Sequence, residues 1–522
     1  MSKTATIIGG GHNGLVCACY LARAGLDVTI LERRSIVGGA AVTEEFHPGY
    51  RNSAASYTVS LLHPKVISDL HLHDHGMKIL ERRVNNYLPL SSGDSLISYP
   101  DANQFHSEIA RFSAQDVRQL KKYNETLDAV VPVIKDLMLV TPPSIVDHGF
   151  ADISRYFHLS KQFRKLNTSQ KRLLLRLFSI SAGEMLDDTF ESDPIKALFG
   201  FDAIVGHFAS PYAPGSAYVL LHHLVGEVNG KQGLWGHSVG GMGAITQAMA
   251  REATSLGVKI ELEAEVENLE ISHKKVQGIT LKSGRVIKSD ITVANVNPKL
   301  LFSDLIEASD LSGDTKSHFD TYKCQSGTFR MNVALSALPN FAARTAPHVL
   351  EAGIIMAPSL DYMDKAFTDA RLGGWSQRPI VEMLIPSIVD DSLAPAGHHV
   401  ASLFCQQFDP SLGQNWDLHR EKVADLILNT VEEYAPGFKQ TIIARQIHSP
   451  WDLEQKFGLT GGDIFHGRLS LDQLFSARPM LGIGDYHTEF KNLYLCGSGT
   501  HPGGGVSGLP GHNAAREIIR SL

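Results

Sequence analysis

The chain has 522 residues, of which 43% are hydrophobic and 20% charged, and this is the composition of an ordinary globular protein. The length favours two closely joined domains, and the composition excludes a disordered, collagenous or disulfide-rich chain. Forty-eight basic and fifty-five acidic residues give a net charge of -7, so no overall positive field favours nucleic acid as a partner. No run of 18 or more apolar residues occurs, so we expect no membrane-spanning helix.

The first residues and the cysteines bear on where the protein works. A β-strand is predicted almost from the first residue, which leaves no room for a signal or transit peptide, so we expect a cytoplasmic protein. None of the five cysteines forms a C-x-x-C motif, and Cys17 and Cys19 would point to different faces of one helix. We therefore expect neither a redox pair nor a metal site, and interpret the cysteines as small buried residues.

The first predicted unit is a strand, a tight turn, a helix and a second strand. A β-branched run at residues 4–8 predicts the first strand, and residues 9–14 form the turn. A helix over residues 15–24 ends at Gly25, and residues 27–31 predict the second strand. This order is half of a parallel βαβ unit.

Glycine-rich strand ends occur at both ends of the chain. Between them lies a mostly helical stretch over residues 65–228, followed by a helix that glycines introduce and that ends near Leu256. Four strands that resemble a meander come next, at residues 258–262, 265–271, 276–281 and 286–294. The last forty residues predict a strand at 493–496, a glycine-rich loop at 497–508 and a helix at 512–522. We expect one domain built from residues 1–70, 231–300 and 480–522, and a second domain built from residues 71–230 and 301–479.

The first turn carries a dinucleotide-binding motif, G-x-G-x-x-G. Gly9 permits the sharp turn, Gly11 lets the backbone approach a pyrophosphate, and Gly14 permits close helix packing. The phosphates would then lie at the N-terminus of the helix, where free N–H groups and the helix dipole favour negative charge. Glu32 ends the second strand, where it can accept hydrogen bonds from an adenosine ribose and would repel the 2′-phosphate of NADP. A fortuitous glycine-rich turn is the alternative, and it would have to explain all of these features together.

A second glycine pair, Gly38 and Gly39, follows Glu32 and indicates a loop that passes close to an extended cofactor. The pattern E-x(5)-G-G-x-x-x-T after the first motif resembles the FAD fingerprint of the amine oxidase and phytoene desaturase superfamily. Residues 492–508, NLYLCGSGTHPGGGVSG, are similar to the closing signature of bacterial and fungal carotenoid desaturases. Through GGGHNG and LERRSIVGGAAVTEEFHPGY, the chain looks most like the branch called pyridine nucleotide-disulfide oxidoreductase domain-containing protein 2.

This resemblance implies an α/β protein with a Rossmann-type FAD-binding domain, made of a parallel sheet and a β-meander, and an inserted mixed α+β substrate domain. It implies FAD as the cofactor and a phytoene dehydrogenase-like oxidoreductase as the activity. The candidate FAD-binding residues are Gly9, Gly11, His12, Asn13, Gly14, Glu32, Arg33, Gly38, Gly39, Ala40, Val266, Gly497, Ser498, Pro502, Gly503, Gly504, Gly505 and Val506.

The terminal glycines and two departures from the family pattern refine this set. Gly503 to Gly505 would approach the flavin ring without a side-chain clash, and by resemblance the backbone of Val266 would meet the adenine. Many members have Arg where this chain has Ala40, so Arg33 or Arg34 is the alternative phosphate partner. Ser498 stands where many flavoproteins carry an acid, and carotenoid desaturases often lack that acid too.

The expected chemistry is removal of a hydride from carbon of a lipophilic substrate, for which the protein mainly supplies orientation and a dry pocket. The catalytic residues are unknown. His501, Tyr57 and His466 are candidates from their positions near the motifs, with loop packing, core packing and simple exposure as the respective alternatives. The chain lacks a second strand-GxGxxG-helix unit, because Gly241-Met242-Gly243 does not follow a predicted strand. This lack argues against a disulfide reductase and leaves oxygen or a quinone as the electron acceptor.

Two other function classes stay open. A flavin amine oxidase would need an aromatic cage beside the ring, and a non-enzymatic FAD-bound scaffold or regulatory protein would not turn over. The oligomeric state also stays open, with a homo-oligomer as one alternative.

Residues 153–183 carry seven basic and no acidic residues, a local charge of +7 in a chain of -7. Apolar residues such as Phe157 and Leu175 are interleaved, which is typical of basic amphipathic helices. One interpretation is peripheral contact with an anionic membrane, which would suit a lipophilic substrate. The other is that the helices pack their apolar faces inside the protein and leave the charges solvated.

Overall fold

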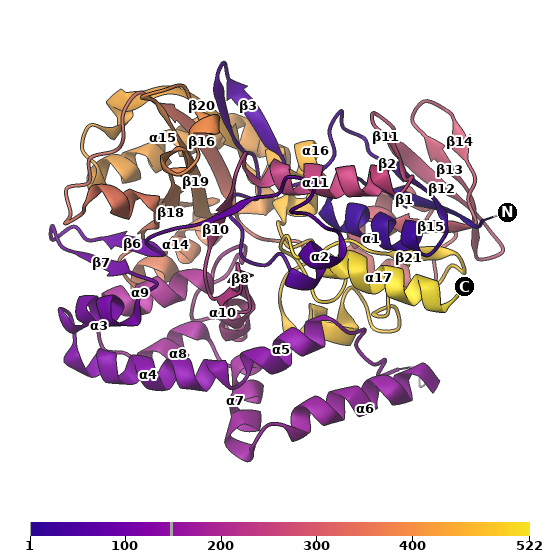
Figure 1. The fold of residues 1–522 in the computed structure, drawn as a ribbon, viewed down its shortest axis with the longest axis horizontal. Helices are drawn as coiled ribbons and strands as arrows, with labels where there is room; N and C mark the ends of the chain where they lie inside the picture. The colour runs from indigo at the N-terminus through magenta and orange to yellow at the C-terminus, as the bar shows by residue number, and fades with distance from the viewer. Residues whose placement is uncertain (1, 147–149) are drawn as a thin grey trace.

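The computed structural model describes residues 2–146 and 150–522, which form two main sheets with helices around and between them (Figure 1). Both termini lie at the same end of the molecule, beside the parallel sheet. The other end is formed by the seven-stranded sheet.

The parallel sheet has the strand order β11-β2-β1-β15-β21. Its strands are β1 (Thr4–Ile8), β2 (Asp27–Leu31), β11 (Lys259–Glu261), β15 (Ile291–Ala294) and β21 (Leu493–Leu495). β1 and β15 are short, rich in β-branched residues and mostly buried, as expected of parallel strands that are covered on both faces, and β21 is buried too. The predicted parallel sheet is therefore confirmed, and its strands come from the beginning, middle and end of the chain.

Alternate residues of these strands face two different apolar cores. Ile7 and Val293 pack toward α1 (His12–Arg23), α11 (Met242–Ser255) and α17 (Leu509–Arg520). Ile8 and Ala294 pack toward the meander, whose strands are β12 (Val266–Ser272), β13 (Lys275–Leu281) and β14 (Val286–Ile287).

Two details of the predicted meander were wrong. The segment expected at residues 258–262 became β11, at the edge of the parallel sheet, because it pairs with β2. The strand expected over residues 286–294 is divided into β14, in the meander, and β15, between β1 and β21.

The second sheet has the order β20-β16-β19-β18-β17-β6-β7, antiparallel except for the β17–β6 pair. Its strands are β6 (Asn86–Pro89), β7 (Ser95–Ser98), β16 (Phe329–Leu335), β17 (Gly353–Met356), β18 (Trp375–Leu384), β19 (His399–Phe408) and β20 (Ile442–His448). One face is covered by α15 (Trp416–Tyr434), with which it forms an apolar core. The opposite face is turned toward the parallel sheet and the helices.

Most helices of the middle region lie in the lower half of Figure 1, although the first of them, α2, lies higher. They are α2 (Pro64–Asp69), α3 (Ala102–Ala110), α4 (Ala114–Asp128), α5 (Val131–Met138), α6 (Phe150–Arg164), α7 (Thr168–Ser179), α8 (Ala182–Asp187), α9 (Asp193–Asp202) and α10 (Ser216–Leu224). The expectation of a mostly helical stretch over 65–228 missed the strands β5 (Ile79–Glu81), β6, β7 and β8 (Glu227–Val228).

The remaining elements are short hairpins and helices. They are β3 (Thr43–His47), β4 (Tyr50–Ser53), β9 (Lys231–Gln232), β10 (Gly236–Ser238), α12 (Pro298–Leu300), α13 (Gly313–Thr321), α14 (Leu360–Gly373) and α16 (Pro450–Phe457). Contrary to the prediction, a short strand, β10, does precede Gly241-Met242-Gly243. It pairs antiparallel with β5, so it forms no second βαβ unit.

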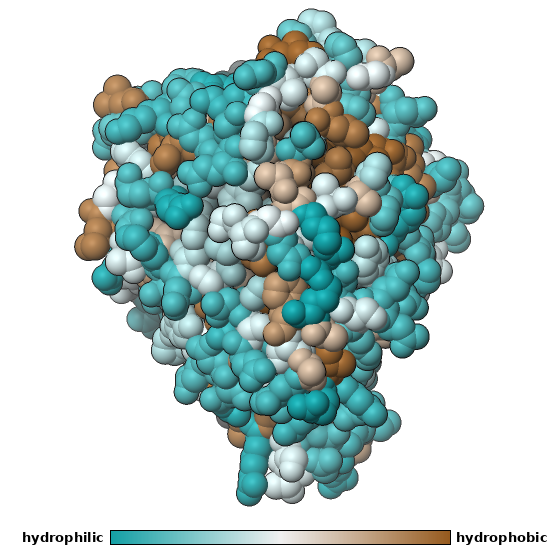
Figure 2. All heavy atoms as spheres, turned by 90° about the vertical axis from the view of Figure 1, so that its left-hand side faces the viewer, coloured by the Kyte–Doolittle hydropathy of each residue, from teal (hydrophilic) through white to brown (hydrophobic). Residues whose placement is uncertain are grey.

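The surface at the end away from the termini is hydrophilic over most of its area, with apolar side chains in smaller groups (Figure 2). No helix in the described part of the chain is long and apolar enough to cross a membrane. All five cysteines are buried, as predicted, and none of them forms a disulfide.

Candidate functional site

The glycine-rich turn between β1 and α1 forms one wall of a long cavity. Gly9 adopts φ +99°, a conformation that other residues rarely adopt, and its N–H donates to the Leu31 carbonyl at 2.8 Å. Gly11 precedes α1 without any side-chain cap, so the first N–H groups of the helix are left for a ligand. A Cβ on Gly14 would lie 2.4 Å from the Gly9 carbonyl oxygen, so this glycine serves packing.

Glu32 is held beside this turn by the backbone. It is only 5% exposed, and its Oε2 accepts from the Gly10 N–H at 2.8 Å while Oε1 accepts from the Arg34 N–H at 2.9 Å. A carboxylate offers about four acceptor positions, so two stay available toward the cavity. The acid is therefore fixed in place for hydroxyl donors of a ligand.

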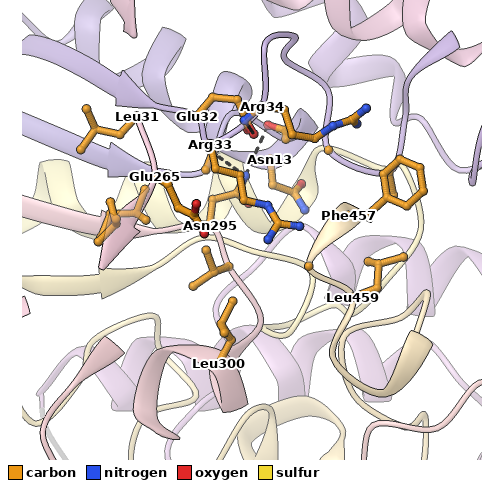
Figure 3. A pocket seen from close by; sticks show the side chains of 18 of the residues that line it. Asn13, Leu31, Glu32, Arg33, Arg34, Glu265, Asn295, Leu300, Phe457 and Leu459 are labelled. Atoms are coloured by element: carbon orange, nitrogen blue, oxygen red, sulfur yellow. Dashed lines mark hydrogen bonds between the residues drawn. The ribbon is translucent and has the colours of Figure 1, made fainter. Parts of the chain in front are cut away.

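The rest of the cavity wall comes from four separate parts of the chain (Figure 3). In this view Glu265 lies at the left, Phe457 and Leu459 lie at the right, with Phe457 beside Arg34, and Leu300 lies below. Glu32, Arg33 and Asn295 complete the wall.

Three buried polar atoms on this wall, His12 Nε2, Asn13 Oδ1 and Arg34 Nη1, have no hydrogen-bond partner within the described residues. Together with the uncapped helix N-terminus they fit a long, polar, anionic ligand such as FAD.

Both arginines considered as phosphate partners line this cavity. Arg33 donates to the Gln455 carbonyl at 3.0 Å. Arg34 forms an ion pair with Glu44 at 2.5 Å and lies over the Phe457 ring, 5.0 Å from its centroid. Many family members have an arginine at the position of Ala40 as a phosphate partner. In this chain Arg33 or Arg34 can supply that positive charge from the wall of the same cavity.

A second cavity meets the first one at His12, Ala40, His466 and Ser498, which line both. Its wall is mainly apolar and aromatic, with Val59, Leu61, Phe201, Val205, Trp235, Met242, Phe404, Ile464, Phe465 and Val506. Such a cavity, continuous with a dinucleotide site, is suited to bring a second molecule to one end of the cofactor.

Neutral histidines stand where the two cavities meet. Burial lowers the pKa of His12 to about 4 and that of His466 to about 3. His466 Nδ1 is buried and has no hydrogen-bond partner within the described residues. At neutral pH these imidazoles can exchange hydrogen bonds with a ligand, but they carry no charge.

The C-terminal loop is fixed by a buried arginine that sequence reasoning missed. Arg478 donates to the Phe465 carbonyl at 2.6 Å and to the Ser498 carbonyl at 3.0 Å. A Cβ on Gly504 would lie 2.4 Å from the Phe465 Cα, so Gly504 lets the two segments touch. Asn13 Nδ2 donates to Ser498 Oγ at 3.0 Å and so joins this loop to α1.

A family model described as flavin containing amine oxidoreductase matches residues 14–319, more than half of the chain. The protein named pyridine nucleotide-disulfide oxidoreductase domain-containing protein 2 from Rattus norvegicus is 39% identical over 544 aligned residues, which cover 99% of this chain and 93% of that one. The chain belongs to the flavin-containing amine oxidoreductase family.

More distant relatives agree with this assignment. A phytoene desaturase (lycopene-forming) from Pseudescherichia vulneris is 25% identical over 526 aligned residues, covering 98% of this chain and 97% of that one. The structure of wild-type putrescine oxidase bound to putrescine shares the fold, with a TM-score of 0.61 at 12% identity over 100% of this chain and 99% of that one. Membership of this family establishes FAD as the cofactor and an FAD-dependent oxidoreductase as the activity.

The predicted FAD-binding residues of this flavin oxidoreductase fall into three groups. Those that line the first cavity are Gly9, Gly11, His12, Asn13, Glu32, Arg33, Gly39, Ala40, Val266 and Ser498. Gly505 and Val506 line the second cavity. Gly14, Gly38, Gly497, Pro502, Gly503 and Gly504 line neither of the two and lie behind their walls. Their contacts with FAD stay predictions.

The structure separates the three catalytic candidates. Tyr57 and His466 line the second cavity, where a substrate would reach the flavin. His501 lies elsewhere: its Nε2 is 3.0 Å from the Leu137 carbonyl, and it borders a different cavity, between α5, α6 and α17. A catalytic part for any of them stays a prediction.

Sequence reasoning did not find several polar residues of the second cavity. Arg82 follows β5, Asp202 ends α9 and Glu382 lies near the end of β18, and all three line it. No motif marks them. The one available signal was a charged residue inside an apolar run, as Glu382 is among residues 379–384 of β18.

Proposed function

We propose that the enzyme removes a hydride from carbon of a lipophilic substrate, in the manner of a desaturase or dehydrogenase. The observation that carries this proposal is the apolar, aromatic second cavity that opens onto the FAD cavity at His12, Ala40, His466 and Ser498. The relative named phytoene desaturase (lycopene-forming) supports the same substrate class.

When bound, FAD supplies the hydride acceptor. The chain itself binds and orients the substrate and keeps water out, through wall residues such as Phe201, Trp235 and Phe404. His466 stays neutral because burial lowers its pKa to about 3, so it adds no charge beside the apolar substrate. Burial and the neighbouring Glu382 raise the pKa of Tyr57 well above its usual value, so its hydroxyl stays protonated.

An amine oxidase is the second candidate, because the matching family model and the putrescine oxidase structure carry that description. One feature of the cavity disfavours it. The rings of Tyr57 and Phe404 stack on each other with centroids 5.1 Å apart, so no amine fits between them as it would in an aromatic cage.

Anaerobic titration of the FAD-loaded protein distinguishes these functions. We expect long-chain unsaturated hydrocarbons or their polar derivatives to bleach the flavin absorption, and primary amines of equal length to leave it unchanged. Reduction by amines alone would establish the amine oxidase, and a flavin that stays oxidised with every compound would establish the scaffold. Reoxidation of the reduced protein by oxygen or by a quinone then identifies the acceptor.

We also propose that the enzyme contacts an anionic membrane surface through α6 and the exposed side chains of Ile145 and Val146. Ile153 and Phe157, four residues apart on the outer face of α6, are 63% and 70% exposed, and Ile145 and Val146 are 58% and 56% exposed. This helix lies along the lower edge of the molecule in Figure 1. Exposed apolar side chains grouped on one edge are typical of a surface that meets lipid or another protein.

The charges on this edge support lipid as the partner. Lys161, Arg164, Lys171 and Arg172 are exposed and form no ion pair within the described residues. Three other basic residues are occupied: Arg155 by Asp152 and Glu517, Lys165 by Asp136, and Arg176 by Asp188. Leu166, Leu174 and Leu177 are buried, so part of the stretch packs inside as the alternative interpretation expected.

Co-sedimentation with vesicles tests this contact. We expect binding to vesicles that contain phosphatidylglycerol, weaker binding as salt rises, and a loss of about 2 kcal/mol or more when Lys171 and Arg172 are changed to Glu. The matched control is the double reversal of Lys316 and Arg371, which are exposed on other helices, α13 and α14. If both double variants lose the same amount of vesicle binding, the effect comes from net charge alone and the proposed contact is refuted.

A further inference from the structure

A charged row crosses three neighbouring strands of the seven-stranded sheet. Arg330 of β16 is paired with Phe404 of β19, and Phe404 is paired with Glu382 of β18. The adjacent residues of the same strands, such as Met331 and Leu403, point to the other face and join the apolar core under α15. The row therefore lies on the face that borders the second cavity, which Phe404 and Glu382 line.

Tyr57 lies across this row and ties it together. Its ring stacks on Phe404 at 5.1 Å with an angle of 22° between the ring planes, and the Arg330 guanidinium carbon is 4.5 Å from its centroid. Its hydroxyl donates to Glu382 Oε2. One oxygen of the single carboxylate in the row is thereby engaged.

Arg82 adds a second buried guanidinium, only 8% exposed, to the cavity wall. Its Nη2 donates to Thr58 Oγ1 at 2.6 Å and to the Gly236 carbonyl at 3.5 Å. Arg330 Nη2 donates to Ser402 Oγ at 2.6 Å.

Nε and Nη1 of Arg330 are buried and make no hydrogen bond in the described part of the chain. Arg82 makes its hydrogen bonds there through Nη2 alone, and neither guanidinium forms an ion pair with a described residue. We call Tyr57, Arg82, Arg330 and Glu382 the head-group site.

The charges of this site do not balance. Removing a charge from water is costly unless an opposite charge compensates it, yet here two guanidinium groups share one carboxylate. Asp202, the other acid of the wall, forms no ion pair with either arginine in the described part of the chain, and burial together with Glu382 raises its pKa to about 7. The chain therefore leaves one cation of the site without a matching anion.

We propose that a carboxylate of the substrate completes the head-group site, held by Arg82, and that the substrate is a long-chain carboxylate. Its hydrocarbon part then lies along the apolar wall toward His12 and His466, where the FAD cavity begins. A guanidinium binds a carboxylate through two parallel hydrogen bonds, and Arg82 has the free donors for them. An ammonium group would instead stand beside two cations. This inference rests on the proposed function and names its substrate class.

The test uses the FAD-loaded protein and three saturated sixteen-carbon compounds: hexadecanoate, hexadecan-1-ol and hexadecylamine. Binding is measured from the perturbation of the flavin spectrum and by calorimetry, without turnover. We expect hexadecanoate to bind at least about ten-fold more tightly than the alcohol, as expected for a hydrogen bond to a charged group. Arg82→Met should abolish this preference, and Arg82→Lys should keep part of it because the charge stays while the paired geometry is lost.

Arg83→Met is the matched control. Arg83 is the next residue, its side chain is 68% exposed, and it pairs with Glu351 outside the cavity. We expect it to bind hexadecanoate as the unmodified protein does.

The unmodified protein alone can overturn the proposal, whether or not the variants fold. It would do so by binding hexadecanoate and hexadecan-1-ol with equal affinity, or by binding hexadecylamine more tightly than hexadecanoate. A changed flavin reduction potential in unliganded Arg82→Met would overturn it as well, because Arg82 would then act on the cofactor. Tight binding of hexadecanoate without flavin reduction by any unsaturated acid would retain this site and refute the proposed function.

Discussion

Replacing Glu32 by Ala should weaken FAD binding by about 1.5 to 3 kcal/mol, which is about 10- to 150-fold in Kd. The carboxylate already accepts the Gly10 and Arg34 N–H groups at 2.8 and 2.9 Å, so its remaining acceptor positions are the ones available to the adenosine ribose. The variant loses these charge-assisted bonds. It also leaves the buried Gly10 N–H without its acceptor, which should cost the apoprotein a further 1 to 3 kcal/mol, roughly.

Titration of the apoprotein with FAD, followed by the quenching of flavin fluorescence, measures the first effect, and thermal unfolding without FAD measures the second. Glu32→Gln should fall between Ala and Glu, because its carbonyl oxygen still accepts one N–H while the charge is gone. Glu267→Ala is the control, since Glu267 is exposed on β12 and lines neither cavity. A Glu32→Ala protein that binds FAD as tightly as the unmodified one would refute the assignment of Glu32 to the ribose.

Three further predictions concern reduction of the flavin by nicotinamide cofactors, stability at acidic pH, and packing at Gly14. NADH and NADPH should reduce the flavin far more slowly than about 10 per second, an ordinary turnover rate. The reason is that the described chain holds one strand-GxGxxG-helix unit, and FAD occupies it. Rapid reduction in a stopped-flow experiment would contradict this prediction. Stability and FAD retention should fall steeply as the pH drops from 6.5 toward 4. Burial lowers the pKa of eight histidines to about 3 or 4, so below pH 6.5 the unfolded chain binds protons that the folded chain does not. Each such histidine lowers the free energy of unfolding by about 1.4 kcal/mol per pH unit in this range. A melting temperature that is unchanged between pH 7 and 5 would contradict this prediction. Gly14→Ala should lower the free energy of unfolding by about 1 to 3 kcal/mol, since its Cβ would meet the Gly9 carbonyl oxygen at 2.4 Å. Gly373→Ala, with nothing within 4 Å of its Cβ, should show no such loss in the same denaturant titration.

The FAD half of the molecule could be predicted from sequence because its signals are local. A strand, a turn that needs glycine, a helix and Glu32 occupy consecutive residues, and each has a backbone reason to be there. The meander was predicted for the same reason, although the pairing of β11 with β2 and the central place of β15 depend on partners distant in the chain.

The substrate half could not be predicted in the same way. Arg330, Phe404 and Glu382 become neighbours only when β16, β18 and β19 pair, and nothing local specifies that register. Arg82 and Arg478 are buried cations whose partners are backbone carbonyls or hydroxyls outside their own helix or strand. In a sequence, such residues look like ordinary surface charges. For His501 the prediction failed in the opposite way. It was a candidate because it is close to the C-terminal glycine motif in sequence, but its ring borders a different cavity from the one that Tyr57 and His466 line.

The order of strands in the parallel sheet has a consequence for biosynthesis. The Gly9 turn and Glu32 leave the ribosome early, but β15 follows much later, and β21 with the loop at 497–506 comes later still. Ser498, which closes both cavities, and the carbonyl that Arg478 holds belong to that late segment. A nascent chain therefore offers half of a cofactor site throughout most of its synthesis. Tight FAD loading becomes a property of the finished fold, so the yellow colour of the protein marks chains in which these distant segments have met.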